Sequence, residues 1–166
     1  SRHSTDGNDW SVFEKGLANK RAQIRFHHLQ PLVFDQIDFV QGNQASRHLQ
    51  QFQDLQKINP EIVGWITMDD TQINYPIVQA KDNDYYLFRN YKGEDMRAGS
   101  IFMDYRNDVK SQNRNTILYG HRMKDGSMFG SLKKMLDEDF FMSHRKLYYD
   151  TLFEGYDVEV FSVYTT

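Results

Sequence analysis

One histidine stands at the end of a predicted strand, and it is the side chain in this sequence best placed to do chemistry. The β-branched and aromatic run Thr116 to Tyr119 is typical of a buried strand, and Gly120 and His121 follow it. Because strand side chains alternate, Ile117, Tyr119 and His121 are expected on one face. Gly120 leaves room for another backbone or a ligand to come close. The pattern predicts an imidazole held at a strand end, where it could exchange a proton.

The histidines also have a plainer interpretation. A lone histidine at a strand end is more often structural than catalytic, because only a convergent partner makes it catalytic. The other five are interpreted as surface residues: His3, His27, His28, His48 and His144. None of the six forms a tight metal-ligand spacing, so we expect neither a metal nor a cofactor.

Length and composition exclude several classes of function. The 166 residues fit one domain of ordinary size, with a net charge of -3 and a pI near 6.0. A nucleic-acid interface or a patch for anionic membranes would need clustered lysine and arginine, and the acidic net charge argues against both. No apolar run approaches the length of about 18 residues that suggests a membrane helix, and no signal peptide is visible at Ser1. Cysteine is absent, which excludes disulfides, thiolate metal sites and a cysteine nucleophile within these residues.

The first 60 residues have helical patterns. Ser11 and Glu14 match the spacing of a capping box, and apolar residues follow at near-helical spacing as far as Ile24. A second amphipathic helix is predicted over residues 45–58, because apolar residues recur every three or four positions before Asn59 and Pro60 end it. We therefore expect residues 1–60 to be an N-terminal helical extension and residues 61–166 to be a partial β barrel, packed together as one domain.

From Ile62 onward the pattern changes to the period of strands. Two strands, 62–68 and 72–78, are predicted to form a hairpin in which Pro76 requires an edge or a bulge. A short helix over 82–89, a strand over 99–104, a helix capped by Ser127 and a helix after the acidic run 137–139 follow. The last two strands, 146–153 and 156–164, are predicted to pair across a turn. About six strands with peripheral helices are typical of an antiparallel sheet or a small barrel, so the fold class is mainly β.

The final predicted strand is apolar on both of its faces. Val158 and Val160 are apolar on one face, and Phe161 and Val163 are apolar on the other. A strand covered on both faces rarely ends a sheet alone. We expect more chain to follow Thr166, or an N-terminal helix to cover the strand instead.

Four segments carry a family resemblance: VGWITMDDTQINYPIVQ (63–79), GSIFMDYRND (99–108), NTILYGHRMKDGSMFGSL (115–132) and VFSVY (160–164). Together they closely resemble the class B sortases, cysteine transpeptidases of the Gram-positive cell surface. The resemblance implies a sortase-like β barrel with peripheral helices and an N-terminal helical extension, incomplete at the C-terminus. It places His121 on the catalytic histidine of the family. Asn83 and Leu87 match positions that border the groove for the sorting signal.

The resemblance also implies a reaction. In the family a cysteine thiolate attacks the threonine carbonyl of a sorting signal, and an amine of a cell-wall precursor or a pilin lysine resolves the thioester. The catalytic cysteine and arginine are expected beyond Thr166, so this chain alone is predicted to be inactive. The implied location is the outer face of the Gram-positive cell membrane, reached through an N-terminal anchor that these residues do not include.

Two other functions stay open. The chain could be a non-catalytic peptide-binding module that keeps the groove, or a hydrolase in which His121 works with tyrosine or aspartate partners and no thiol. Asn83 could instead cap a helix, and Leu87 could belong to the core.

Overall fold

The structure is a computed structural model that describes residues 10–16, 21–26, 32–35, 37–39, 45–110, 113, 115–153 and 155–165. Four strands precede the first helix: β1 (Trp10–Gly16), β2 (Arg21–Phe26), β3 (Leu32–Asp35) and β4 (Ile37–Phe39). Six more strands follow it: β5 (Ile62–Thr67), β6 (Asn74–Val78), β7 (Ile101–Met103), β8 (Asn115–His121), β9 (Lys146–Thr151) and β10 (Gly155–Thr165). The helices are α1 (Ala45–Ile58), α2 (Glu138–Ser143) and the 3-10 helices η1 (Tyr85–Phe88) and η2 (Gly130–Leu136).

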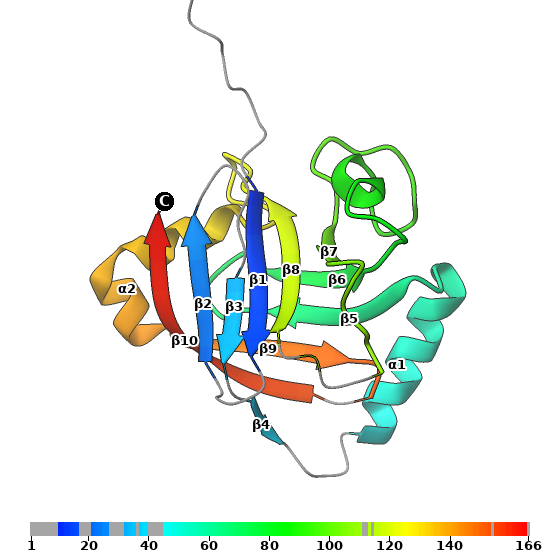
Figure 1. The fold of residues 1–166 in the computed structure, drawn as a ribbon, viewed down its shortest axis with the longest axis horizontal. Helices are drawn as coiled ribbons and strands as arrows, with labels where there is room; N and C mark the ends of the chain where they lie inside the picture. The colour runs from blue at the N-terminus through cyan, green and yellow to red at the C-terminus, as the bar shows by residue number, and fades with distance from the viewer. Residues whose placement is uncertain are drawn as a thin grey trace, which may run out of the picture.

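These strands form one sheet that curls back on itself. The strand order is β2-β1-β8-β7-β6-β5-β9-β10-β4, and β3 pairs with β1. β2 and β10, which lie far apart in this order, also pair with each other in parallel. In Figure 1, β1, β2 and β8 run across the layer made by β5, β6 and β9. The described strands therefore close a barrel, which confirms the mainly β fold class and removes exposed edges from most of the sheet.

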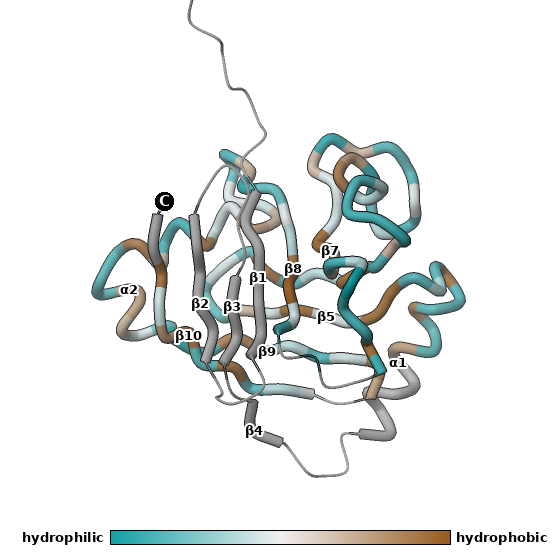
Figure 2. The backbone as a smooth tube through the Cα atoms, viewed as in Figure 1, coloured by the Kyte–Doolittle hydropathy of each residue, from teal (hydrophilic) through white to brown (hydrophobic). Residues whose placement is uncertain are grey.

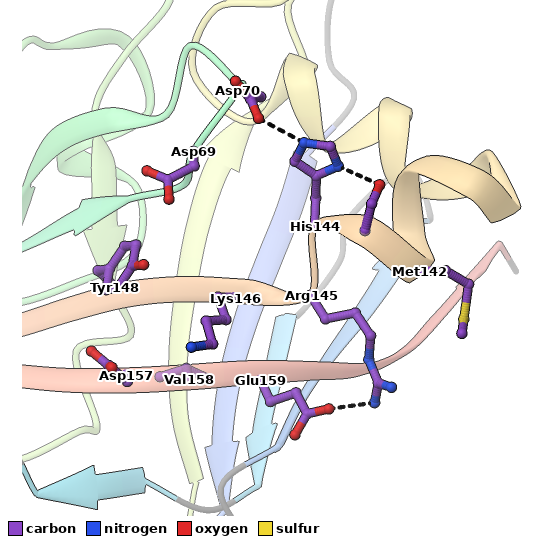
Figure 3. A pocket seen from close by; sticks show the side chains of 11 residues that line it. Asp69, Asp70, Met142, His144, Arg145, Lys146, Tyr148, Asp157, Val158 and Glu159 are labelled. Atoms are coloured by element: carbon purple, nitrogen blue, oxygen red, sulfur yellow. Dashed lines mark hydrogen bonds and ion pairs between the residues drawn. The ribbon is translucent and has the colours of Figure 1, made fainter.

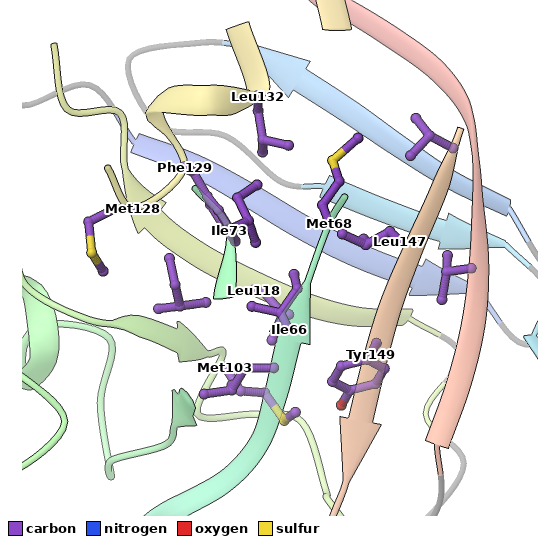
Figure 4. Close-up of a cluster of buried hydrophobic side chains, with 14 of the residues drawn as sticks. Ile66, Met68, Ile73, Met103, Leu118, Met128, Phe129, Leu132, Leu147 and Tyr149 are labelled. Atoms are coloured by element: carbon purple, nitrogen blue, oxygen red, sulfur yellow. The ribbon is translucent and has the colours of Figure 1, made fainter. Parts of the chain in front are cut away.

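Two hydrophobic clusters fill the barrel and its side. The larger cluster lies between the strands and η2, as Figure 4 shows for Ile66, Met103, Leu118 and Tyr149. The smaller one joins α1 to the outer face of the sheet and is made by Phe52, Ile62, Val78, Tyr86 and Phe102. Along the tube of Figure 2, hydrophobic residues are prominent on β5 and β8, while hydrophobic and hydrophilic residues alternate along the described part of α1. Apolar side chains are therefore buried on both faces of the sheet, although the sequence predicted two apolar faces only for the last strand.

The predicted hairpins are confirmed with small changes of boundary. β5 and β6 pair antiparallel, and β9 and β10 pair antiparallel across the turn before Gly155. Pro76 lies opposite Trp65, and the pairing of β6 with β7 includes only Ile77 and Val78. The missing N–H of Pro76 therefore falls where β6 has one neighbour, as expected of an edge position. β6 and β7 run parallel, so of the two expected arrangements, an antiparallel sheet or a small barrel, the structure has the barrel, and it is not wholly antiparallel.

The helix predicted after the capping box is wrong. Residues from Trp10 to Gly16 form β1, which pairs antiparallel with β8 along its whole length and brings Trp10 opposite His121. A capping box is a local signal, and pairing with the edge of β8 satisfies the backbone of both strands, which outweighs it. The helix predicted over residues 45–58 is confirmed as α1. The domain boundary at residue 60 stays a prediction.

β10 obtains its neighbours from the N-terminal part of the chain. Beyond β9, it pairs with β4 through Val158 and Ile37, and with β2 from Glu159 to Thr165. The expectation that this strand needs a neighbour is met by strands and not by a helix. The expectation that more chain follows Thr166 stays open.

The helix predicted from Ser127 differs from the structure. η2 begins at Gly130, and Ser127 instead donates its hydroxyl to Asp125 within the predicted turn. Because η2 is a 3-10 helix, Leu132 and Met135 share its buried side while Leu136 is exposed. The acidic start predicted for the next helix is confirmed, because Asp137 caps α2 by accepting a hydrogen bond from Phe140 N at 2.9 Å.

Candidate active site around His121

His121 lies at the end of β8, as predicted, but inside the protein. Its side chain is only 1% exposed. The carbonyl oxygen of His121 accepts a hydrogen bond from Phe129 N at 2.9 Å, which ties the loop after β8 back to the strand end. Within that loop Gly126 adopts a φ of 84°, as a tight turn requires. The strand and its returning loop together fix the backbone that carries the imidazole.

Gly120 is required by the core and not by a ligand. A Cβ at this position would overlap Ile101 Cδ1 and lie 2.8 Å from Phe129 Cδ2. Ile101 and Phe129 are both fully buried. The expectation that another backbone or a ligand approaches here is therefore corrected: two core side chains occupy the space.

The imidazole of His121 is held by the segment that contains η1. Its Nε2 lies 2.8 Å from the carbonyl oxygen of Leu87. The ring of Phe88 lies with its centroid 5.5 Å from the imidazole centroid, tilted by 44°. Phe88 is 49% exposed, so the ring that contacts the buried imidazole also forms part of the protein surface. The structure therefore brings together His121 and Leu87, two of the three predicted site residues, through the main chain of Leu87.

Asn83 takes part in a different contact. It precedes η1, its Nδ2 donates to Asp104 Oδ2 at 3.0 Å, and its Oδ1 accepts from Tyr105 N at 3.0 Å. Its amide therefore fastens the start of the η1 segment to the loop after β7. It does not cap η1, since Asp82 accepts the hydrogen bonds from Asp84 N and Tyr85 N. The side chain of Leu87 is partly buried against the smaller cluster, in agreement with a partial core role.

Asp104 is a structural residue near this site that the sequence reasoning did not single out. Its carboxylate is 1% exposed and binds Arg106 through both oxygens, at 2.8 and 2.7 Å. Tyr119, two residues before His121, donates its hydroxyl to the same carboxylate at 2.8 Å. Aspartate followed two residues later by arginine was visible in the segment GSIFMDYRND, but nothing local indicated that Tyr119 and Asn83 converge on it.

The charge on Asp104 is stabilised by these donors. Burial disfavours the carboxylate, but the hydrogen bonds from Arg106, Tyr119 and Asn83 outweigh burial and hold the pKa of Asp104 well below its usual range. Burial, and then the hydrogen bond to Asp104, raise the pKa of Tyr119. Asp104 therefore stays ionised and Tyr119 stays protonated at neutral pH, and the pair anchors the strand that ends in His121.

A cavity of about 600 Å³ lies elsewhere on the described surface (Figure 3). It is bounded by the β5–β6 turn, the end of α2 and strands β9 and β10. A hydrogen bond between His144 and Asp70 at 2.7 Å and an ion pair between Arg145 and Glu159 at 2.7 Å line it. Neither His121 nor Leu87 lines this cavity, so it is separate from the candidate site.

Across the described ranges, no group of three or more histidine, aspartate or glutamate side chains is placed to hold a metal ion. In the same part of the chain, no helix is both long and apolar enough to cross a membrane.

Comparison with known proteins identifies the family. The sortase domain profile matches residues 66–166, more than half of the sequence. The chain therefore belongs to the sortase family. Sortase B of Listeria monocytogenes is 56% identical over 116 residues, and sortase B of Staphylococcus aureus is 46% identical over 157 residues. These relatives place the chain in class B.

Solved structures agree with this assignment. Sortase B from Bacillus anthracis, in complex with AAEK2, is 94% identical over 66% of this chain and 51% of that chain, with a TM-score of 0.65. The Staphylococcus aureus sortase B–substrate complex is 43% identical over 72% of this chain and 57% of that chain, with a TM-score of 0.68. The matches to the two curated relatives cover 70% and 95% of this chain but only 47% and 63% of the relatives. The chain thus spans between about half and two thirds of their length.

Proposed function

We propose that this chain is the part of a class B sortase that supplies the catalytic histidine, His121, for transfer of a sorting-signal peptide to an amine. The observation that supports the proposal most is the position of His121: the sortase match includes it, and its ring is held at a strand end by the carbonyl of Leu87. The 166 residues contain no cysteine. The thiol nucleophile must therefore come from residues outside them, and the chain alone is expected to be inactive.

The proposed reaction has two transfers, and His121 moves a proton in each. A cysteine thiolate attacks the carbonyl carbon of the threonine in the sorting signal, and an arginine stabilises the oxyanion. The C–N bond then breaks, the imidazolium of His121 gives its proton to the departing amine, and a thioester forms. In the second transfer the acceptor amine attacks the thioester, the C–S bond breaks, and the proton lost by the amine returns to the imidazole. The acceptor is an amine of a cell-wall precursor or a pilin lysine.

The proposed substrate groove runs past η1. Asn83 and Leu87 are assigned to its border by their match to family positions, and the exposed ring of Phe88 extends the same surface beside His121. A Staphylococcus aureus sortase B that is 43% identical has been solved as a substrate complex, which supports a peptide substrate for this chain. We place the parent protein on the outer face of the Gram-positive cell membrane, as the family resemblance implies.

Joining the chain to the missing catalytic groups tests this function. The C-terminal part of Listeria monocytogenes sortase B, with its cysteine and arginine, would be appended after Thr166, and cleavage of a fluorogenic sorting-signal peptide would be measured. We expect cleavage by the chimera and none by the chain alone. Replacing His121 with alanine should lower kcat/KM by about 10² to 10⁴, the usual contribution of a positioned acid or base.

His144→Ala is the matched control, because it removes an imidazole that lines the separate cavity. It should leave cleavage within about twofold, since a partly exposed polar contact away from the site contributes little. Equal activity of the His121→Ala chimera and the unmodified chimera would refute the catalytic role. Tight, specific binding of the peptide by the 166-residue chain, together with an inactive chimera, would favour the non-catalytic binding module instead.

A further inference from the structure

The contact between His121 and Leu87 determines which ring nitrogen carries the proton. A carbonyl oxygen can only accept a hydrogen bond, and that of Leu87 lies 2.8 Å from Nε2 of His121. In a neutral imidazole one nitrogen donates and the other accepts. The contact therefore selects the tautomer with hydrogen on Nε2.

Two neighbouring residues, Gly99 and Ser100, hold the main chain around Leu87 in place. Ser100 N donates to the carbonyl of Tyr86 at 3.1 Å, and Ser100 Oγ donates to the carbonyl of Arg89 at 2.7 Å. Because carbonyls at the end of a helix have no donor within the helix, they depend on such outside partners. Ser100 is only 4% exposed, so water cannot easily replace it. One residue thus fastens the carbonyls on both sides of Leu87.

Gly99 allows this close approach. Its φ is 61°, a conformation that favours glycine. A Cβ at this position would overlap the Leu87 carbonyl oxygen and lie 2.8 Å from the Tyr86 carbonyl oxygen. A side chain here would push the Leu87 carbonyl out of line with the imidazole. We call Gly99 and Ser100 the η1 bracket.

We propose that the η1 bracket is the positioning element of His121: it holds the Leu87 carbonyl against Nε2 and fixes the Nε2–H tautomer. That this tautomer serves catalysis rests on the proposed function. The tautomer and its dependence on Ser100 do not, because they concern the folded chain before any reaction. Gly99 and Ser100 are positioning residues, since they act on the imidazole through Leu87.

Nuclear magnetic resonance of the 166-residue chain tests the proposal without catalysis. With ¹⁵N-labelled histidine at alkaline pH, where imidazoles are neutral, the ¹⁵N shifts of each ring report which nitrogen is protonated. We expect His121 to be almost entirely the Nε2–H tautomer, with an Nε2 proton that exchanges slowly with water. Ser100→Ala should change the tautomer ratio about two- to tenfold, the effect expected from loss of one hydrogen bond, and should speed that exchange.

Ser143→Ala is the matched control. The hydroxyl of Ser143 also donates to main-chain carbonyls, those of Asp139 and Phe140, but it lies at the end of α2, outside the segments that hold His121. This variant should leave the His121 spectrum unchanged. The proposed role of the bracket would be refuted if both variants changed the His121 tautomer ratio equally, or if Ser100→Ala left that ratio and the Nε2 proton exchange unchanged.

The unmodified chain decides the question even when Ser100→Ala does not fold, because a predominant Nδ1–H tautomer would refute the proposal by itself. That result would leave the activity of the chimera and its dependence on His121 untouched. Conversely, an inactive chimera with an Nε2–H tautomer would refute the proposed function and leave the bracket in place.

Discussion

Replacing Gly120 with alanine should destabilise the protein, although the backbone of this strand residue suits alanine. Gly120 lies in β8 and is not among the glycines with positive φ. The new methyl would overlap Ile101 Cδ1 and lie 2.8 Å from Phe129 Cδ2. Overpacking of this kind costs about 1–3 kcal/mol, while the stiffer unfolded chain of an alanine variant returns about 0.4–1 kcal/mol. The net loss in the free energy of unfolding should be roughly 1–2 kcal/mol.

A second substitution tests whether the predicted loss of stability comes from the overlap with Ile101. Ile101→Val deletes Cδ1, the atom that the new methyl would overlap, and alone it should cost about 0.5–1.5 kcal/mol as a buried methyl is lost. In the presence of Gly120→Ala the same deletion relieves the overlap. The double variant should therefore be more stable than the sum of the single effects predicts, by about 1 kcal/mol. Some cost should remain, because Phe129 still lies close to the new methyl.

Urea unfolding of the four proteins, followed by circular dichroism, measures these quantities. The midpoints should shift while the slope with denaturant stays constant, which would show that stability and not compactness has changed. Additivity of the two single variants within about 0.3 kcal/mol would refute the packing described around Gly120. So would a Gly120→Ala variant as stable as the unmodified chain.

Two further predictions concern the response to pH. Asp104→Asn should lower stability by about 2–4 kcal/mol at neutral pH, because a buried charged acceptor of several hydrogen bonds is lost. The pKa of Asp104 is lower in the folded than in the unfolded state. The ionised Asp104 therefore stabilises the fold at pH values above its unfolded-state pKa, and this stabilisation is lost as the pH falls below that value toward the folded-state pKa. Urea midpoints measured against pH should thus fall less steeply in acid for this variant, and an identical acid slope would contradict the role of Asp104. At alkaline pH stability should instead fall as pH rises, because burial raises the pKa values of three tyrosines in the folded state: Tyr86, Tyr119 and Tyr149. Above about pH 10 the unfolded chain loses phenol protons that the folded chain keeps, so stability should fall, and ultraviolet absorbance should show these tyrosines ionising only on unfolding.

The elements that sequence could predict are those with a strong local signal. The run before His121 has residues that favour strands, and β8 is where it was expected. The spacing of apolar residues before Asn59 predicted α1, and the acidic start after Leu136 predicted the capped helix α2. In each case the local pattern agrees with the tertiary packing.

The parts that could not be predicted depend on contacts between distant residues. The capping box at Ser11 indicated a helix, whereas pairing with β8 makes the segment a strand. The approach of Leu87 to His121 spans 34 residues and uses a main-chain carbonyl, which leaves no trace in residue type. Gly99, the first residue of the predicted strand 99–104, was the one visible sign of it, because a glycine in a strand can mark close approach by another backbone. Whether Asn83 and Leu87 contact a substrate stays a prediction.

The parallel pairing of β6 and β7 has a consequence for how such a protein can diversify. Parallel neighbours cannot be joined by a tight turn, so residues 79–100 must cross over from one strand to the next. That crossover carries Asn83, η1 and the bracket, and both of its ends are fixed in a closed barrel. Its middle, where Arg89 and Asp95 pair across a short loop, can therefore change length and sequence without altering the register of any strand. Ligand preference can thus evolve in this connection while the strand that holds the imidazole stays the same.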